Sequence, residues 1–220
     1  MKRIIIIIPL FLFAFFCFGQ KNQHLEPADM LNQDDGTLEE YYEKMFKVLY
    51  KGFSEEPFAR YVSMPSFQND YAFSVETIGG KAYIISNSLS HRLSLKKPNI
   101  KPKTNKTKIE NKLYIKIGEL FQLLAEQTKI IKIYTYTKDG TLISNRKMGF
   151  DGTTFLFYTT DKNGYIKIGT TWSPESDTLL GKLIKICDNL YFIGNGKNIS
   201  QMDVAADIDI LINDMKLFNR

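Results

Sequence analysis

The sequence predicts an α+β fold in which antiparallel strands form one sheet and amphipathic helices cover mainly one face of it. Two runs of β-branched and aromatic residues, 153–160 and 165–172, have the composition of strands. Between them lies the tetrapeptide Asp161-Lys162-Asn163-Gly164, whose Asn and Gly tolerate the positive φ of a tight reversal. Apolar residues then recur at spacings of three and four from Leu179 to Tyr191, which is typical of a helix that buries one face. We therefore expect a hairpin followed by a helix that packs against it.

The helix of this unit is expected to begin at Ser173-Pro174-Glu175, which combine a capping hydroxyl, a proline suited to the first turn and a carboxylate at the positive helix end. Its buried ridge should run through Leu183 and Cys187. Trp172, the only tryptophan, stands where the strand meets the helix. We interpret it as a packing anchor, with ligand stacking in a cleft as the alternative.

The N-terminus has the pattern of a secretory signal peptide at residues 1–19. Met1-Lys2-Arg3 precede an almost unbroken apolar run from Ile4 to Phe18, which is short for a membrane span and ends at Gly19. Cleavage after Gly19 predicts an exported protein, either periplasmic or secreted. Lipid anchoring at Cys17 is the less favoured alternative, because Phe16 is too bulky for the position before an acylated cysteine.

The rest of the chain is expected to form one domain with flanking segments. Residues 20–36 are predicted to be a polar tether, 37–193 a single α+β domain, and 194–220 a C-terminal helical extension packed on that domain. The formal net charge of +5 becomes +3 once Lys2 and Arg3 are removed, and this mild excess does not indicate a nucleic-acid-binding protein. Cys187 is then the only cysteine, which we interpret as a buried small hydrophobe and not as a nucleophile.

Local patterns predict the remaining elements in chain order. A hydroxyl and a carboxylate at Thr37 and Glu40 cap a first helix that ends near Gly52, and Gly79-Gly80 mark a hairpin turn inside a three-strand meander. Apolar stripes predict a second helix and a terminal helix, and alternation predicts a strand that turns at Asp139-Gly140. The expected ranges are strands 58–64, 70–78, 81–87, 130–137 and 141–144, and helices 111–128 and 200–218.

Two charged groups and one basic segment are candidate binding residues. Arg60 and Glu76 interrupt apolar strands, so they either pair across strands or line a ligand cleft. The segment 91–108 has no acidic residue, and its prolines predict a mobile basic loop. It is either a solvated loop or a contact for anionic lipid headgroups, acidic glycans or an acidic envelope protein, while its lack of interleaved aromatics argues against nucleic acid. The candidate contact residues in it are Arg92, Lys96, Lys97, Lys101 and Lys103.

Two sequence blocks carry a resemblance. The motifs DGTTFLFY, GTTWSP and a helix ending in CDNLY form one block, and FARYVSMPSFQNDYAFSVE near the start of the domain forms the other. Together they resemble uncharacterised exported proteins of Gram-negative anaerobic bacteria. The resemblance implies export, but it brings no activity and no catalytic residue.

No catalytic, cofactor-binding or metal-binding residue is predicted. The two histidines, His24 and His91, fall in no zinc pattern, and no nucleophile-elbow sequence is present. Asp203 and Asp207 could meet on one helix face as metal ligands, but without a supporting histidine a solvated acidic face is favoured. The leading hypothesis is a non-enzymatic binding or interaction module of the cell envelope. The alternatives are a carboxylate-dependent hydrolase of envelope polymers and an inhibitor or immunity-type partner of a secreted enzyme.

Overall fold

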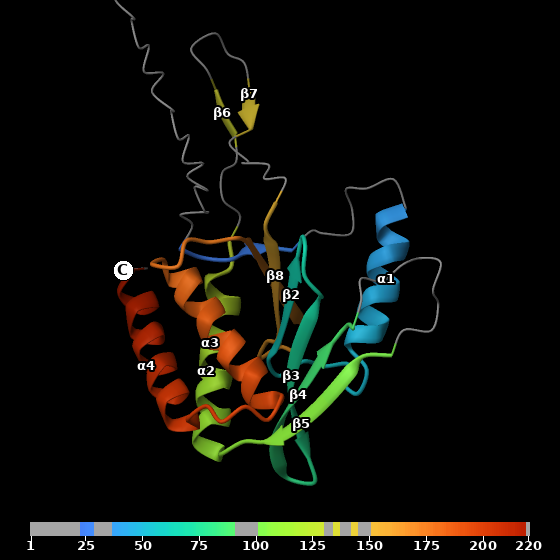
Figure 1. Cartoon of the computed structure of the whole chain (residues 1–220). Coiled ribbons are helices and arrows are strands. Elements are labelled where there is room, and N and C mark those ends of the chain that lie inside the picture. The colour runs from blue at the N-terminus through green and yellow to red at the C-terminus, as the bar shows by residue number, and fades with distance from the viewer. Residues whose placement is uncertain are drawn as a thin grey trace, which may run out of the picture.

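A computed structural model describes residues 23–28, 37–90, 101–129, 134–136, 142–144 and 151–218. Within these ranges the chain forms four helices, a seven-stranded antiparallel sheet and a separate two-stranded hairpin (Figure 1). The α+β class predicted from the sequence is confirmed. None of the helices in these ranges combines the length and the apolar character needed to cross a bilayer.

The large sheet has the strand order β1-β9-β8-β2-β3-β4-β5. The expected meander appears as β2, β3 and β4, and the expected hairpin as β8 and β9. Strands β2 and β8 join these two units at the centre of the sheet, with Tyr61 opposite Phe157. The bounds are β1 Glu26–Pro27, β2 Arg60–Pro65, β3 Tyr71–Ile78, β4 Lys81–Ser88, β5 Lys103–Lys108, β8 Thr153–Thr160 and β9 Ile166–Trp172, with β6 Tyr134–Tyr136 and β7 Leu142–Ser144 in the small hairpin.

Three helices cover one face of the sheet, which we call the inner face, and one helix lies on the opposite, outer face (Figure 1). The inner helices are α2 (Asn111–Gln127), α3 (Leu179–Gly194) and α4 (Gln201–Phe218), and the outer helix is α1 (Thr37–Leu49). The predicted ridge through Leu183 and Cys187 is fully buried against the inner face. Lys116 and Lys182 pair with Asp209 and Asp214 at 2.8 and 2.9 Å, so α4 is also held by ion pairs.

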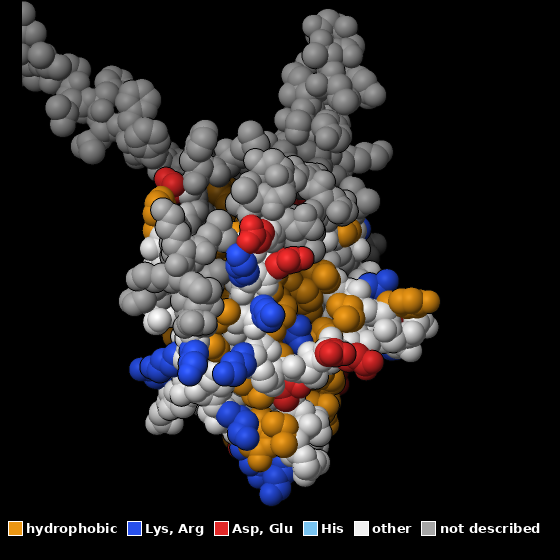
Figure 2. Space-filling view, turned by 90° about the vertical axis from the view of Figure 1, so that its right-hand side faces the viewer, with side chains coloured by type: hydrophobic (Ala, Val, Ile, Leu, Met, Phe, Trp, Pro, Cys, Tyr) orange, Lys and Arg blue, Asp and Glu red, His pale blue; other side chains and the backbone are white. Residues whose placement is uncertain are grey.

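The outer face carries a smaller core. Met45 and Leu49 of α1 pack on Val62 and Leu156 of the sheet. The amide of buried Asn87 donates to the carbonyls of Leu49 and Lys51 at 2.6 and 2.9 Å, which ties the end of α1 to β4. Figure 2 faces this side of the molecule and shows lysine and arginine side chains gathered toward its lower left.

The helix start predicted at Ser173 is wrong. Helix α3 begins at Leu179, where the Thr178 hydroxyl accepts from the N–H of Gly181 at 3.0 Å. The Ser173 hydroxyl instead accepts from the N–H of Thr153 at 2.8 Å. The Ser173 hydroxyl, which could cap a helix, therefore forms a hydrogen bond across the end of the β8–β9 pair.

The polar tether predicted at 20–36 contains a strand. Glu26 and Pro27 pair with β9, and Leu25 is buried in the inner core. Gly169 on β9 makes the space, because a Cβ there would lie 2.7 Å from the Leu25 Cδ1. Burial of Leu25 thus helps to hold this segment against the sheet, together with its backbone hydrogen bonds.

The loop predicted at 91–108 is wrong for residues 103–108, which form a strand. Residues 91–100, with Arg92, Lys96 and Lys97, lie outside the described ranges, and Lys101 is exposed. Residues 103–108 form the edge strand β5. Its Asn105 and Thr107 side chains donate to the side chain of Asn195 and to the carbonyl of Gly194, which fixes the strand against the end of α3.

Candidate functional site

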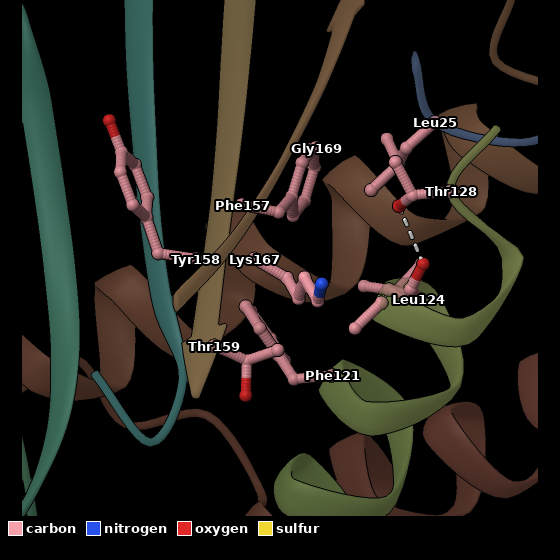
Figure 3. Close-up of a pocket in the computed structure, with 10 residues that line it drawn as sticks. Leu25, Phe121, Leu124, Thr128, Phe157, Tyr158, Thr159, Lys167 and Gly169 are labelled. Atoms are coloured by element: carbon pink, nitrogen blue, oxygen red, sulfur yellow. Dashed lines mark hydrogen bonds between the residues drawn. The ribbon is translucent and has the colours of Figure 1, made fainter. Parts of the chain in front are cut away.

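An enclosed pocket within the described residues is too small for a ligand. It lies between β8, β9 and α2 and holds about 10 Å³. Figure 3 shows Leu25, Phe121, Leu124 and Phe157 converging on this space, with the Thr128 hydroxyl donating to the Leu124 carbonyl at 2.7 Å. The volume suits at most one water molecule, so this pocket is a feature of the core.

A larger opening lies between α3, the start of β8 and the connection from β9 to α3. We call it the α3 cleft, and its volume is about 500 Å³, which is within the range of small-molecule sites. Apolar and polar side chains share its walls. The lining residues are Thr153, Phe155, Ser173, Pro174, Ser176, Gly181, Ile184, Lys185, Asp188, Asn189 and Phe192.

The carboxylate of Asp188 is the most constrained group in the α3 cleft. The hydroxyls of Tyr61 and Tyr71 donate to its Oδ1 at 2.9 and 2.7 Å. Burial raises the pKa of Asp188, and the two tyrosine hydroxyls oppose this by stabilising the charged form. Burial also raises the pKa of both tyrosines, so they remain protonated donors. Residues from β2, β3 and α3 therefore meet in one hydrogen-bonded cluster.

The thiol next to Asp188 takes no part in the α3 cleft. Cys187 is fully buried in the inner core, as expected for a small hydrophobe. Burial raises its pKa well above the usual thiol value, which keeps the sulfur in its unreactive form.

The wall of the α3 cleft at Ser173 is conformationally strained. Ser173 has a φ of 34°, in the region that residues other than glycine rarely adopt. Its backbone N–H donates to the carbonyl of Thr153 at 2.9 Å, so both its backbone and its hydroxyl bind the same neighbour. Just before β8, a Cβ at Gly152 would lie 2.5 Å from the Trp172 ring and 2.6 Å from the Ser173 hydroxyl. Strain of this kind is typical of functional sites.

The rim of the α3 cleft presents groups that suit recognition. Lys185 is exposed, and Phe192 is 42% exposed although it is a large apolar side chain. Lys185 and Asp188 are three residues apart on α3, a spacing at which opposite charges often pair. In the described part of the chain no ion pair forms between them, because Asp188 is turned inward to the tyrosines. The cleft therefore offers separate positive and negative groups.

Trp172, which the sequence marks as an anchor or a ligand contact, faces a second cleft. This opening of about 430 Å³ lies between α1 and the outer face of the sheet. Trp172 shares its lining with Tyr41, Tyr42 and Asp70, and its ring packs on Gly152. The two clefts thus lie on opposite faces of the same corner of the sheet.

Arg60 and Glu76 are buried on the outer face and lie in neither cleft. The guanidinium of Arg60 lies over the ring of Tyr50, 4.5 Å from its centroid, and donates to the Ser54 carbonyl. The N–H of Ser54 donates to Glu76 at 3.1 Å, and the Ser74 hydroxyl does so at 2.6 Å. The two charged groups are therefore linked through the backbone of Ser54, and among the described residues no direct ion pair joins them.

Of the predicted basic residues, the two that the structure describes, Lys101 and Lys103, do not line the α3 cleft. Lys101 and Lys103 lie at the exposed edge of the sheet. Sequence reasoning missed Asp188, Tyr61 and Tyr71 as a cluster. The only local signal is an acid directly beside the apolar ridge at Cys187, and nothing in the sequence indicates its tyrosine partners.

The described residues contain no group of three His, Cys, Asp or Glu side chains that could hold a metal ion. A third cleft of about 440 Å³ lies at the start of α2 and is lined by Glu110. Like the two clefts described above, which are lined by Asp70 and Asp188, it has a single carboxylate among its described lining residues. Comparison of the chain with protein-family models, with curated proteins and with solved structures finds no match in any of the three. The site itself is therefore the basis for a functional proposal.

Proposed function

We propose that the protein is an exported, non-enzymatic binding module of the cell envelope and that the α3 cleft is its ligand site. The observation that carries the proposal is the hydrogen bonding of the Asp188 carboxylate at the wall of the cleft. Its Oδ1 accepts from two tyrosine hydroxyls, while Lys185, Asn189 and Phe192 line the open part of the cleft. Such a site has recognition groups on a rigid support, which is the arrangement expected for binding.

The carboxylate-dependent hydrolase is less well supported. Hydrolysis of a glycosidic bond by this route uses two carboxylates that face each other across the substrate. In the described ranges the α3 cleft has one carboxylate, and that one is committed to the hydrogen bonds that join α3 to the sheet. This difference favours binding over turnover.

The lining of the α3 cleft suits a sugar that carries a carboxylate. The exposed ammonium of Lys185 can bind the acidic group, and Asp188 and Asn189 can accept from or donate to hydroxyls. Phe192 offers an aromatic face for the apolar side of a sugar ring. An acidic glycan is thus the ligand class that uses all of these groups.

The test is an NMR titration of the mature, isotope-labelled protein with glucuronic acid and, separately, with neutral glucose. We expect glucuronic acid to shift amide signals of α3 and the Ser173 connection, and Lys185→Gln to weaken binding by about tenfold, as for loss of one charge-assisted contact. Lys182→Gln is the matched control, because Lys182 lies one turn away and pairs with Asp214. It should leave the affinity unchanged.

Two results would count against this function. Shifts confined to regions other than α3 would remove the α3 cleft as the site. Product formation from acidic oligosaccharides that is lost in Asp188→Asn would show that the protein is an enzyme.

The export step has its own test, which is the N-terminal residue of the mature protein. Cleavage after Gly19 gives free or cyclised Gln20 and keeps Leu25, which the core requires. An acylated Cys17 would instead show a lipid-anchored protein.

A further inference from the structure

Helix α4 is apolar on two opposite sides. Its inner side contributes six buried residues to the core, namely Val204, Ala205, Ile208, Leu211, Ile212 and Met215. On the side of α4 that points away from the core, Met202, Ile210 and Leu217 are 65, 58 and 65% exposed. A helix of a protein surface normally has one apolar face and one polar face. The exposed apolar residues on the solvent side of α4 therefore need a separate explanation.

The exposed apolar residues form one line along the helix. Met202, Ala206, Ile210 and Leu217 are spaced by four, four and seven residues, which places them on the same side of α4. The exposed polar residue Asn213 lies on the same side, between Ile210 and Leu217. At 1.5 Å per residue the line is about 22 Å long. We call it the α4 stripe. Exposed apolar surfaces of this extent mark interaction sites more often than scattered single residues do.

An acidic row runs beside the α4 stripe. Asp203, Asp207 and Asp214 are spaced by four and seven residues and lie along one flank of it. Asp214 pairs with Lys182 at 2.9 Å, whereas Asp203 and Asp207 form no ion pair with the residues that the structure describes. The surface thus combines an apolar line with two aspartates, Asp203 and Asp207, that form no ion pair among the described residues.

This charge distribution decides between possible occupants. In a two-fold dimer each molecule presents the same patch to its partner, so antiparallel packing along the α4 stripe would set the acidic row against its own copy. Like charges in that position oppose association. An anionic lipid surface is disfavoured for the same reason. A segment with basic residues beside its own apolar face has the complementary pattern.

We propose that the α4 stripe is a docking surface for an amphipathic cationic helix of a partner protein. The apolar faces of the two helices pack on each other, and basic residues of the partner lie along Asp203 and Asp207. This surface is independent of the α3 cleft, so the proposal does not depend on the proposed function.

The test uses an 18-residue synthetic peptide of leucine and lysine patterned as an amphipathic helix, and a scrambled peptide of the same composition. Fluorescence anisotropy with the mature protein at physiological salt gives the two dissociation constants. We expect the patterned peptide to bind at least about tenfold more tightly, because only it presents an apolar face. Ile210→Asp should weaken its binding by a similar factor, and the matched control Ile78→Asp, at a hairpin residue that is 44% exposed, should not.

The acidic row has a separate variant. Asp203→Asn combined with Asp207→Asn should lower the affinity about threefold or more and flatten its dependence on salt, because screening acts on exposed charges. If Ile210→Asp reduces thermal stability, Leu217→Gln at the end of the stripe replaces it.

Several outcomes would overturn the proposal. Equal binding of the patterned and scrambled peptides would show a purely ionic contact. Unchanged affinity in the stripe variants would place the contact elsewhere. Sedimentation showing a dimer that Ile210→Asp dissociates would identify a second copy as the occupant, and co-sedimentation with phosphatidylglycerol vesicles that the same variant abolishes would identify a membrane.

Discussion

The two faces of the sheet are stabilised in different ways. Three helices cover the inner face, and the side chains between them form one large apolar core with Tyr61, Phe73 and Leu183 fully buried. One helix covers the outer face, where the apolar cluster is small and Arg60, Glu76 and Asn87 are buried beside it.

The difference shows how a lightly covered face is held together. Apolar burial is non-directional and scales with area, so three helices can rely on it. A single helix buries less area, and α1 depends on placed hydrogen bonds such as those from Asn87 to the last carbonyls of the helix. The inner face should therefore be sensitive to lost volume, and the outer face to lost polar contacts.

The largest expected effect is that of Leu183→Ala. The side chain is fully buried in the inner core, and its truncation should lower the free energy of unfolding by about 2–5 kcal/mol. Urea denaturation measures this value. Leu49→Ala, an equally buried position on the outer face, should cost clearly less, because the end of α1 can relax over the gap. Equal costs would contradict the distinction between the faces.

Asn87→Ala should have an intermediate effect, on the outer face alone. The substitution leaves the carbonyls of Leu49 and Lys51 without their donor, but it also removes the unpaired Oδ1 of Asn87. The net loss in the free energy of unfolding should be about 1–2 kcal/mol. Hydrogen exchange should quicken in α1 and stay unchanged in α3. Asn105→Ala, which removes a partly buried bond to Asn195 at the edge strand, is the control and should leave α1 protected. Faster exchange in both helices would show that α1 is not separately anchored.

The smallest expected effect is a pH dependence of stability that arises from the Asp188 carboxyl. Burial raises the pKa of Asp188, so the folded state keeps the proton at pH values where the unfolded chain has lost it. Stability should therefore fall as pH rises from the ordinary Asp value of 3.8 through the folded pKa. Asp188→Asn keeps an acceptor for the two tyrosines and should remove this slope.

Asp161 is a control for that measurement, because its contribution to stability should change with pH in the opposite direction. The N–H groups of Tyr165 and Asn163 lower its pKa, so its contribution is present above the ordinary value and is lost as pH falls through the folded pKa. Thermal unfolding of Asp188→Asn and of Asp161→Asn between pH 3 and 7 compares the two slopes. An unchanged slope in Asp188→Asn would show that its carboxylate is not desolvated.

Local turn and pattern signals predicted most of the sheet. Gly79, Gly80 and Gly164 adopt the positive φ values that their hairpin turns require, and the strands on either side follow from those turns. The apolar spacing of α2, α3 and α4 likewise predicted which helical faces are buried.

The errors lie where a distant residue decides the local structure. Strand β1 depends on the space left by Gly169, and the start of α3 depends on the bond between Ser173 and Thr153. The Asp188 cluster joins residues 127 and 117 positions apart in the chain, so no local pattern could indicate it. Spacing along a sequence shows periodicity, but it does not show which strand a side chain will meet.

The central pairing of β2 with β8 determines how late in the chain the sheet can be completed. Arg60 lies opposite Tyr158, and Glu26 opposite Thr170, so the sheet closes only when the last third of the polypeptide is available. Such high contact order slows folding, because the long intervening loops lose entropy before the contacts form. If the chain is exported as we propose, this delay would keep the polypeptide unfolded during its passage through a translocation channel.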